Sequence, residues 1–145
     1  MNVTIAPTAW TDMPAIRGML VDAGLPVEDI TTSAVQFWTA RGEHTILGAI
    51  GLERYAETGL LRSLVVAPAF RRAGVGDALV EALERAARAS GITQLVLLTE
   101  TAEAFFRRHD YSVADRRAID GKVADSAQFR TCCPASAICM TKSLA

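Results

Sequence analysis

The segment from residue 60 to residue 99 constrains the fold most strongly. It begins with a strand-like run, LLRSLVV (60–66), and continues through the glycine-rich stretch RRAGVG (71–76). A helical pattern then extends from about Gly74 to Ser90, with its apolar positions on one face: Val75, Leu79, Ala82, Leu83 and Ala86. Glu84 and Arg85 fall on other faces. The run QLVLLT (94–99) is almost entirely apolar, which is typical of a strand buried on both sides. This order predicts one βαβ unit with parallel strands.

The rest of the chain adds strands and short helices on either side of this unit. Strands are predicted at 3–6, 35–40, 45–55 and 135–144, a first helix between an N-cap at Thr11 and Gly24, a loop or short helix at 28–34, a short helix at about 101–109, and loosely helical structure at 117–131. Without a linker or an internal repeat, these elements predict a single α+β domain, residues 1–145, with a mixed and mostly antiparallel sheet.

Composition narrows the class of protein. The chain has 145 residues, of which 50% are hydrophobic and 21% are charged, and its formal net charge is −1. These values predict a soluble globular protein and give no general basic field for nucleic acid. Neither a leader peptide nor a membrane-spanning run is expected, so we expect a cytoplasmic protein whose cysteines stay reduced.

The glycine-rich stretch predicts an anion site. The first turn of a helix leaves backbone N–H groups unpaired, and its dipole favours negative charge. Gly74 and Gly76 allow a phosphate to approach those groups, and Arg71 and Arg72 add positive charge. The P-loop motif requires a lysine directly after its last glycine, and no lysine follows Gly76. The dinucleotide motif requires a third glycine at the position where this chain has Leu79. The unpaired N–H groups and the two arginines therefore suit a pyrophosphate, although neither of these two nucleotide-binding motifs is present.

The pattern RxxGxG at 71–76, preceded by the strand LLRSLVV, resembles the acyl-CoA-binding motif of the GNAT acetyltransferases. The resemblance implies acetyl-CoA as cosubstrate, no metal, direct acetyl transfer to a small-molecule amine, and a homodimer as one expected assembly. It implies pyrophosphate binding by the loop and helix start, and a thioester beside the preceding strand. The residues concerned are Arg71, Arg72, Ala73, Gly74, Val75, Gly76 and Asp77 for the loop, and Leu64, Val65 and Val66 for the strand.

Three further stretches resemble the GNAT subgroup associated with arsenic-resistance genes: GLLRSLVVAP, LLTETAEAFFRRHDY and CCPASAICMTK. This finer resemblance implies detoxifying acetylation of an arsenical amine or a related amino acid. Two alternatives remain open. One is an acyl-CoA-binding module without catalysis, and the other is a protein that binds arsenicals through Cys132, Cys133 and Cys139. Buried, inert thiols are the simpler interpretation of the cysteines.

Four residues are candidates for the chemistry. Glu53 is either a general base or a solvated strand end, and Glu100 is either a base or a charge at a helix entry. Arg62 either binds a substrate carboxylate or forms a surface ion pair with Glu53. Because successive strand residues face opposite ways, only one of Arg62 and Ser63 is expected to face the substrate.

Aromatic residues provide no evident general acid. The resemblance places a tyrosine acid of the family at position 106, where this chain has Phe106, and the family glycine at Asp110. Tyr111 is expected in the core, as are Trp10 and Trp38. His109 is expected to act as a cation at a helix end rather than in catalysis.

Overall fold

A computed structural model describes residues 2–119, 121–132 and 136–145. Over these residues, seven strands form one mixed sheet in the order β1-β2-β3-β4-β5-β7-β6. The strands are β1 (Thr4–Pro7), β2 (Gln36–Arg41), β3 (Ile46–Tyr55), β4 (Thr58–Val66), β5 (Gln94–Thr99), β6 (Ser112–Val113) and β7 (Ile138–Ser143). Strands β4 and β5 pair in parallel, and the other neighbouring strands pair in antiparallel fashion. The predicted α+β class is confirmed.

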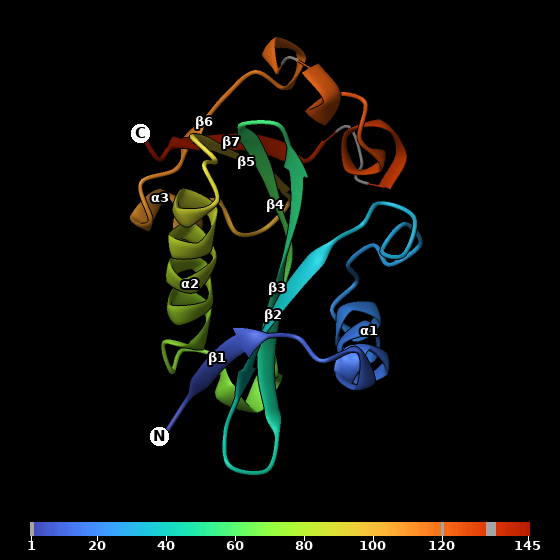
Figure 1. Ribbon diagram of the computed structural model, residues 1–145, viewed down its shortest axis with the longest axis vertical. Helices are drawn as coiled ribbons and strands as arrows, with labels where there is room; N and C mark the ends of the chain where they lie inside the picture. Colours follow the sequence, from blue (N-terminus) through green and yellow to red (C-terminus); the bar gives the residue numbers. More distant parts are fainter. Residues whose placement is uncertain (1, 120, 133–135) are drawn as a thin grey trace.

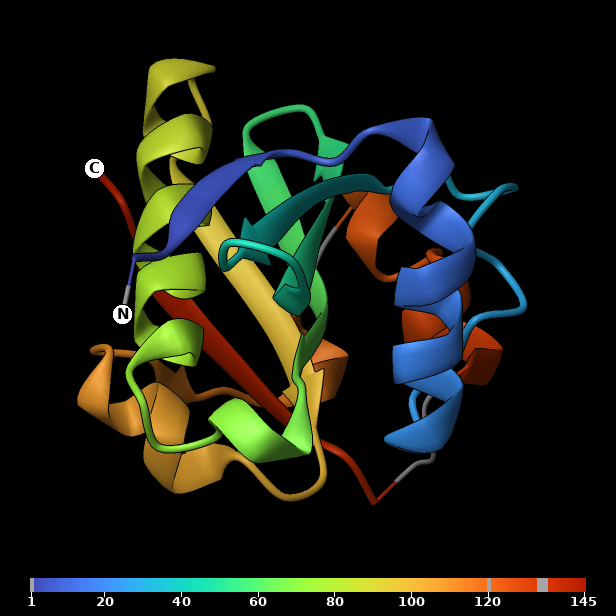
Figure 2. The same ribbon diagram turned by 90° about the horizontal axis from the view of Figure 1, so that it is seen from below.

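Helices cover both faces of the sheet. Helix α1 (Met13–Asp22) lies on one face and α2 (Val75–Ala89) on the other, with the short α3 (Glu103–Arg108) near the C-terminal strands (Figures 1 and 2). A 3₁₀ turn precedes α2 at Pro68–Phe70. Between β6 and β7 lie two further 3₁₀ turns, Arg116–Ala118 and Gly121–Val123, and a π turn, Gln128–Cys132. Apart from residue 120, the segment 116–132 shares the face of the sheet that α1 covers (Figure 1). None of the described helices is long and apolar enough to cross a membrane.

The two faces carry separate apolar clusters. Leu79, Leu83 and Leu95 belong to the cluster under α2. Ile16 and Leu20 of α1 pack with Phe37 and Val65 in a second cluster. A third cluster lies under the segment 116–132, where Leu60, Val96, Val123, Phe129 and Cys139 meet. Burial of these side chains supplies the main favourable contribution to folding.

The βαβ unit is confirmed, and it opens on one side. The parallel pairing of β4 with β5 joins Thr58–Leu60 to Gln94–Val96 and ends there. Beyond this point β4 continues along β3 to Val66, while β5 continues along β7 to Thr99. The two strands therefore diverge toward the end of β4 that leads into the glycine-rich loop.

A β-bulge interrupts β4 within this opening. Gly51 pairs with Arg62 and Ala49 pairs with Val65, so two residues, Ser63 and Leu64, lie opposite Ile50. Ser63 has a φ of 58°, which is unusual for a residue with a side chain.

Several local predictions differ from the structure. Thr11 is not an N-cap: Trp10–Asp12 form a 3₁₀ turn and Asp12 occupies the N-cap position of α1. Trp38 is buried as predicted, but Trp10 is 83% exposed. Glu84, predicted to lie off the apolar face of its helix, is nevertheless buried, because Tyr111 donates a hydrogen bond to it and Lys142 pairs with it. The segment 28–34 consists of turns, in agreement with the loop alternative of its prediction.

Candidate active site

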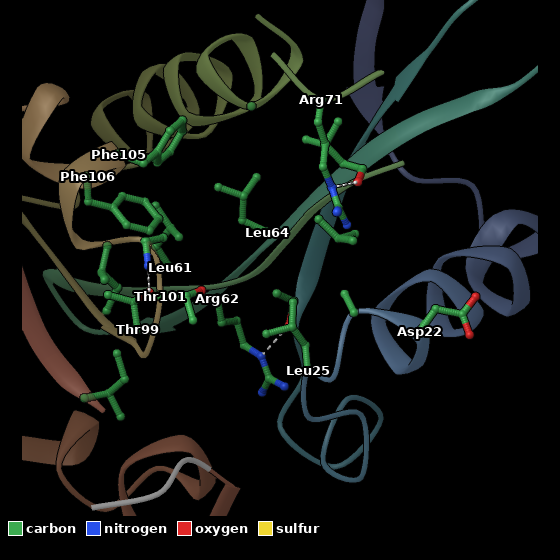
Figure 3. A pocket seen from close by; sticks show the side chains of 18 residues that line it. Asp22, Leu25, Leu61, Arg62, Leu64, Arg71, Thr99, Thr101, Phe105 and Phe106 are labelled. Atoms are coloured by element: carbon green, nitrogen blue, oxygen red, sulfur yellow. Dashed lines mark hydrogen bonds between the residues drawn. The ribbon is translucent and has the colours of Figure 1, made fainter. Parts of the chain in front are cut away.

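A cavity of about 660 Å³ occupies the opening between β4 and β5. Its walls come from β4, the end of β5, the segment that leads into α3 together with Phe105 and Phe106 of that helix, and the end of α1 (Figure 3). The lining residues are Leu61, Arg62, Ser63, Leu64, Val65 and Val66 on β4; Arg71 and Gly76 at the loop and helix start; Leu97, Leu98 and Thr99 on β5; Thr101, Ala102, Phe105 and Phe106 beyond it; and Asp22, Ala23 and Leu25 at the end of α1. The cavity therefore extends from the glycine-rich loop to the loop that follows α1.

The glycine-rich loop opens the first turn of α2. Gly74 is the N-cap residue and has a φ of 83°, a left-handed conformation that favours glycine. A Cβ at Gly74 would meet no atom within 4 Å, so its surroundings are open. At Gly76 a Cβ would lie 3.4 Å from the ring of Phe105. Glycine at these two positions keeps the helix start accessible from the cavity.

Arg71 brings positive charge to the same end of the cavity. Its Nε donates a hydrogen bond to the carbonyl oxygen of Val66 at 3.2 Å, which holds the side chain against the end of β4 (Figure 3). Oδ1 of Asp77, in the first turn of α2, lies 2.7 Å from Nε2 of His109. His109 follows the last residue of α3, so this contact joins the start of α2 to the end of α3.

The predicted cosubstrate-binding residues separate into two groups. Leu64, Val65, Val66, Arg71 and Gly76 line the cavity. Arg72, Ala73, Gly74, Val75 and Asp77 surround it without lining it, and Val75 is buried in the core. The latter group shapes the loop and the helix start.

The four predicted catalytic residues also separate. Arg62 and Ser63 line the cavity, whereas Glu53 and Glu100 do not. Glu100 is exposed after β5. Glu53 is only 1% exposed, so it is not a solvated strand end, and its ion pair with Arg62 is buried rather than at the surface.

A buried charged cluster lies beside the cavity and consists of Asp29, Glu53, Tyr55 and Arg62. Both terminal nitrogens of Arg62 donate to Asp29, at 2.6 and 2.8 Å, and Nη1 also donates to Glu53 at 2.8 Å. Nε of Arg62 donates to Oγ of Ser63 at 3.0 Å. The hydroxyl of Tyr55 donates to the second oxygen of Glu53. Two carboxylates thus share one guanidinium whose side chain is fully buried.

The pKa values in this cluster reflect competition between burial and pairing. Burial alone would raise the pKa of Asp29, but hydrogen bonds and charge from Arg62 outweigh it and hold that pKa below its usual value. Burial alone would lower the pKa of Arg62, and its hydrogen bonds to Asp29 and Glu53 raise it instead. Burial and the Glu53 carboxylate raise the pKa of Tyr55. Asp29 and Arg62 are therefore charged and Tyr55 is neutral near pH 7.

Aromatic side chains close the cavity on the α3 side. Phe106, at the position where a tyrosine acid is expected by resemblance, is buried against Phe105 and Tyr111. Tyr111 is 2% exposed and donates its hydroxyl hydrogen to Glu84, away from the cavity lining. Its predicted place in the core is confirmed. Burial and Glu84 raise its pKa, so it stays protonated.

The cysteines are described only in part. Cys139 is buried among Leu60, Val96 and Phe129, and burial raises its pKa to about 11. Cys133 lies outside the described residues, so the prediction of a shared metalloid site stays untested. Within the described ranges, no group of three or more His, Cys, Asp or Glu side chains has the arrangement of a metal site.

Sequence reasoning missed Asp29, Tyr55 and Asp22. Asp29 lies in the stretch EDITTSA, which has no periodic pattern, and its partner Arg62 is 33 residues away. Asp22 lines the cavity only because α1 ends there. A sequence pattern does indicate Tyr55, since Glu53 and Tyr55 are two residues apart on one strand and share a face.

Comparison with known proteins agrees with this geometry. A mixed sheet that splays beside a glycine-rich helix start is the fold of the GNAT acyltransferases. The family model "Acetyltransferase (GNAT) domain" matches residues 33–113, more than half of the chain. The chain belongs to this family.

Individual relatives share the fold more strongly than the sequence. An amino-acid acetyltransferase of Pseudomonas syringae pv. syringae is 35% identical over 97 residues, which are 66% of this chain and 22% of that protein. The chain thus spans about a fifth of the length of the curated relatives it matches. N-acetylglutamate synthase from Neisseria gonorrhoeae, in complex with coenzyme A and N-acetyl-glutamate, superposes with a TM-score of 0.84 at 18% identity, over 100% of this chain and 36% of that one. Rv2747 from Mycobacterium tuberculosis, in complex with CoA, gives a TM-score of 0.82 at 21% identity, over 98% of this chain and 99% of that one.

Proposed function

We propose that residues 1–145 form a single acetyltransferase domain that transfers an acetyl group from acetyl-CoA to the amine of a small molecule. The observation that carries this proposal is the continuous cavity between the diverging strands β4 and β5, which reaches the glycine-rich start of α2. Family membership and the CoA-bound relatives of the same fold support it.

The loop residues suit the pyrophosphate of acetyl-CoA. Gly74 and Gly76 leave the N–H groups of the first turn of α2 accessible, and Arg71 supplies charge at the same end of the cavity. Arg72 and Ala73 shape the approach to this turn. Acetyl-CoA would supply the activated acetyl group, and Leu64, Val65 and Val66 on β4 would border its thioester.

The reaction requires a neutral amine. The amine nitrogen forms a bond to the acetyl carbon, the carbon–sulfur bond breaks, and the amine loses one proton. Glu53 and Glu100, the predicted bases, do not line the cavity. A role of Glu53 as base would therefore require a water molecule or another group to carry the proton to it.

The acceptor is proposed to be an amino acid or a related small amine. The amino-acid acetyltransferase matched at 35% identity supports this class. The resemblance to the arsenic-resistance subgroup adds arsenic-containing amino acids as a narrower class within it. Binding of a substrate carboxylate by Arg62 would require that carboxylate to replace Asp29 or Glu53, because both already hold the guanidinium.

One observation favours a second candidate, a module that binds acyl-CoA without catalysis. Phe106 stands where a tyrosine acid is expected, and it has no proton to donate. A thiolate is an adequate leaving group without a strong acid, so the enzyme remains our first proposal.

Release of CoA thiol on mixing protein, acetyl-CoA and a panel of amines tests the proposal. The panel contains common amino acids, their phosphorus- and arsenic-containing analogues, simple polyamines and a short peptide. We expect a thiol yield that matches the N-acetylated product for at least one small amine. Acetyl-CoA binding without turnover on any amine would support the binding module, and acetylation of the peptide alone would contradict the proposed substrate class.

A further inference from the structure

We propose that Asp29 is a positioning residue for acetyl transfer, which through Arg62 fixes the Ser63 bulge of β4 at the wall of the cavity. The inference rests on the proposed function. It adds a residue that lies outside the cavity lining and far from β4 in the sequence.

The contacts form a continuous chain from the loop after α1 to β4. Asp29 accepts hydrogen bonds from both terminal nitrogens of Arg62, and Nε of the same guanidinium donates to Oγ of Ser63. Nη1 also reaches Glu53, and Nη2 reaches the carbonyl oxygen of Pro26 at 3.5 Å. Each nitrogen of Arg62 therefore has a partner, and the plane of the guanidinium is set by a two-pronged contact with Asp29.

Asp29 is itself held in place. Its carboxylate accepts a hydrogen bond from Oγ of Ser33 at 2.9 Å. Its carbonyl oxygen accepts from the backbone N–H of Ser33 and from the hydroxyl of Thr32. The side chain is 7% exposed. A loop fastened in this way can transmit a fixed position to Arg62.

The bulge needs such support. A left-handed conformation is unfavourable for a residue with a side chain and persists where its surroundings determine it. Ser63 has this conformation and lines the cavity beside Leu64. The hydrogen bond from Arg62 restrains its side chain, so a change at Asp29 would reach the cavity wall through two contacts.

The same guanidinium also links two sides of the cavity. Leu25 and Pro26 lie at the start of the loop that contains Asp29, and Leu25 lines the cavity (Figure 3). Arg62 contacts this loop and the bulge at once. Asp29 therefore sets the spacing between the wall formed by the loop and the wall formed by β4.

Steady-state kinetics of the full chain test this inference with the Asp29→Asn and Ser63→Ala variants and their double variant. We expect Asp29→Asn to lower kcat at least tenfold, because misplacement of groups near the reacting atoms is costly, while the dissociation constant of acetyl-CoA changes less than about threefold. The double variant should be no slower than the slower single variant, since both changes break one chain of contacts. Asp12→Asn, which removes an exposed ion pair with Arg41, is the matched control and should retain the wild-type kcat.

A rescue experiment separates positioning from stability alone. Glycine adopts a φ of 58° without strain, so Ser63→Gly should restore part of the kcat that Asp29→Asn loses. Full activity of Asp29→Asn, additive losses in the double variant, or no rescue by Ser63→Gly would overturn the inference. If Asp29→Asn does not fold, Ser63→Ala decides: an unchanged kcat overturns the inference. Failure of the proposed function can be distinguished from failure of this inference. In the first case the wild-type protein itself would show no binding or no turnover of acetyl-CoA.

Discussion

Two substitutions of Gly74 test the proposed pyrophosphate site. One adds a side chain without charge, and the other adds a side chain of similar size with a negative charge. Its φ of 83° and the open space around it mean that any side chain there brings backbone strain without a clash. We expect Gly74→Gln to cost about 1–2 kcal/mol of folding free energy, as a left-handed residue with a side chain does. Gly74→Glu has nearly the same shape and the same strain, and it adds one negative charge.

The added charge determines the expected difference in binding. A carboxylate about 5 Å from a pyrophosphate with two negative charges is repelled by about 1.7 kcal/mol even at the dielectric constant of water. This repulsion raises the dissociation constant about 15-fold. We therefore expect Gly74→Glu to bind acetyl-CoA about 15-fold more weakly than Gly74→Gln, with a smaller difference at 1 M salt because ions screen the repulsion.

Isothermal titration calorimetry of the two variants, at low and at high salt, measures this difference. Circular dichroism of each variant confirms that α2 is retained. Equal affinities of Gly74→Glu and Gly74→Gln at low salt would place the pyrophosphate elsewhere and would refute the assignment of the loop.

Three further predictions concern the buried groups. Arg62→Met should lower the free energy of unfolding by about 3–5 kcal/mol, because Asp29 and Glu53 lose their shared cation; a loss below about 1 kcal/mol in urea titrations at pH 7 would contradict this. The pKa of Asp29 is depressed in the folded state, so its contribution to stability is complete above the unfolded pKa of about 4 and is lost as the pH falls through the lower folded value. The stability difference between wild type and Asp29→Asn should accordingly stay constant from pH 5 to 8 and shrink below about pH 4, and a difference that grows on acidification would be inconsistent with this sign. Cys139, whose burial raises its pKa to about 11, should resist iodoacetamide at pH 7 until the protein is unfolded, as peptide mass mapping would show; rapid alkylation in the native protein would refute its burial.

The βαβ unit could be predicted from the sequence because its information is local. Periodic apolar residues determine α2, and a continuous apolar run determines β5. Gly74 is favoured because the residue at the N-cap of α2 adopts a left-handed backbone conformation. The loop residues therefore emerge from a short segment. The class of fold follows, since a parallel pair of adjacent strands needs a helical crossover.

The buried charged cluster could be predicted only in part. An ion pair between Arg62 and Glu53 is one of the alternatives that the sequence leaves open, but its burial and the place of Asp29 depend on contacts made only in three dimensions. Asp29 and Arg62 are 33 residues apart, and no pattern connects a turn after α1 with the middle of β4. Glu53 resembles a strand-end charge in the sequence. The predicted strand 45–55 matches β3, but in the structure Arg62 and Tyr55 bind the Glu53 carboxylate, and the residue is almost fully buried.

Two other misses have the same origin. The strict alternation of a strand places Arg62 and Ser63 on opposite sides, but the bulge interrupts that alternation and the two side chains are hydrogen-bonded. The helical pattern places Glu84 outside the apolar face of α2, but Tyr111 and Lys142 approach it from distant parts of the chain and make its burial favourable.

Calorimetric titration of acetyl-CoA into the wild-type protein, with no acceptor present, tests the central claim most directly. The cavity between β4 and β5 and the accessible start of α2 predict saturable binding at one site per chain, with a micromolar dissociation constant. The absence of binding heat at several temperatures, together with no change in thermal stability on adding acetyl-CoA, would contradict the proposed function.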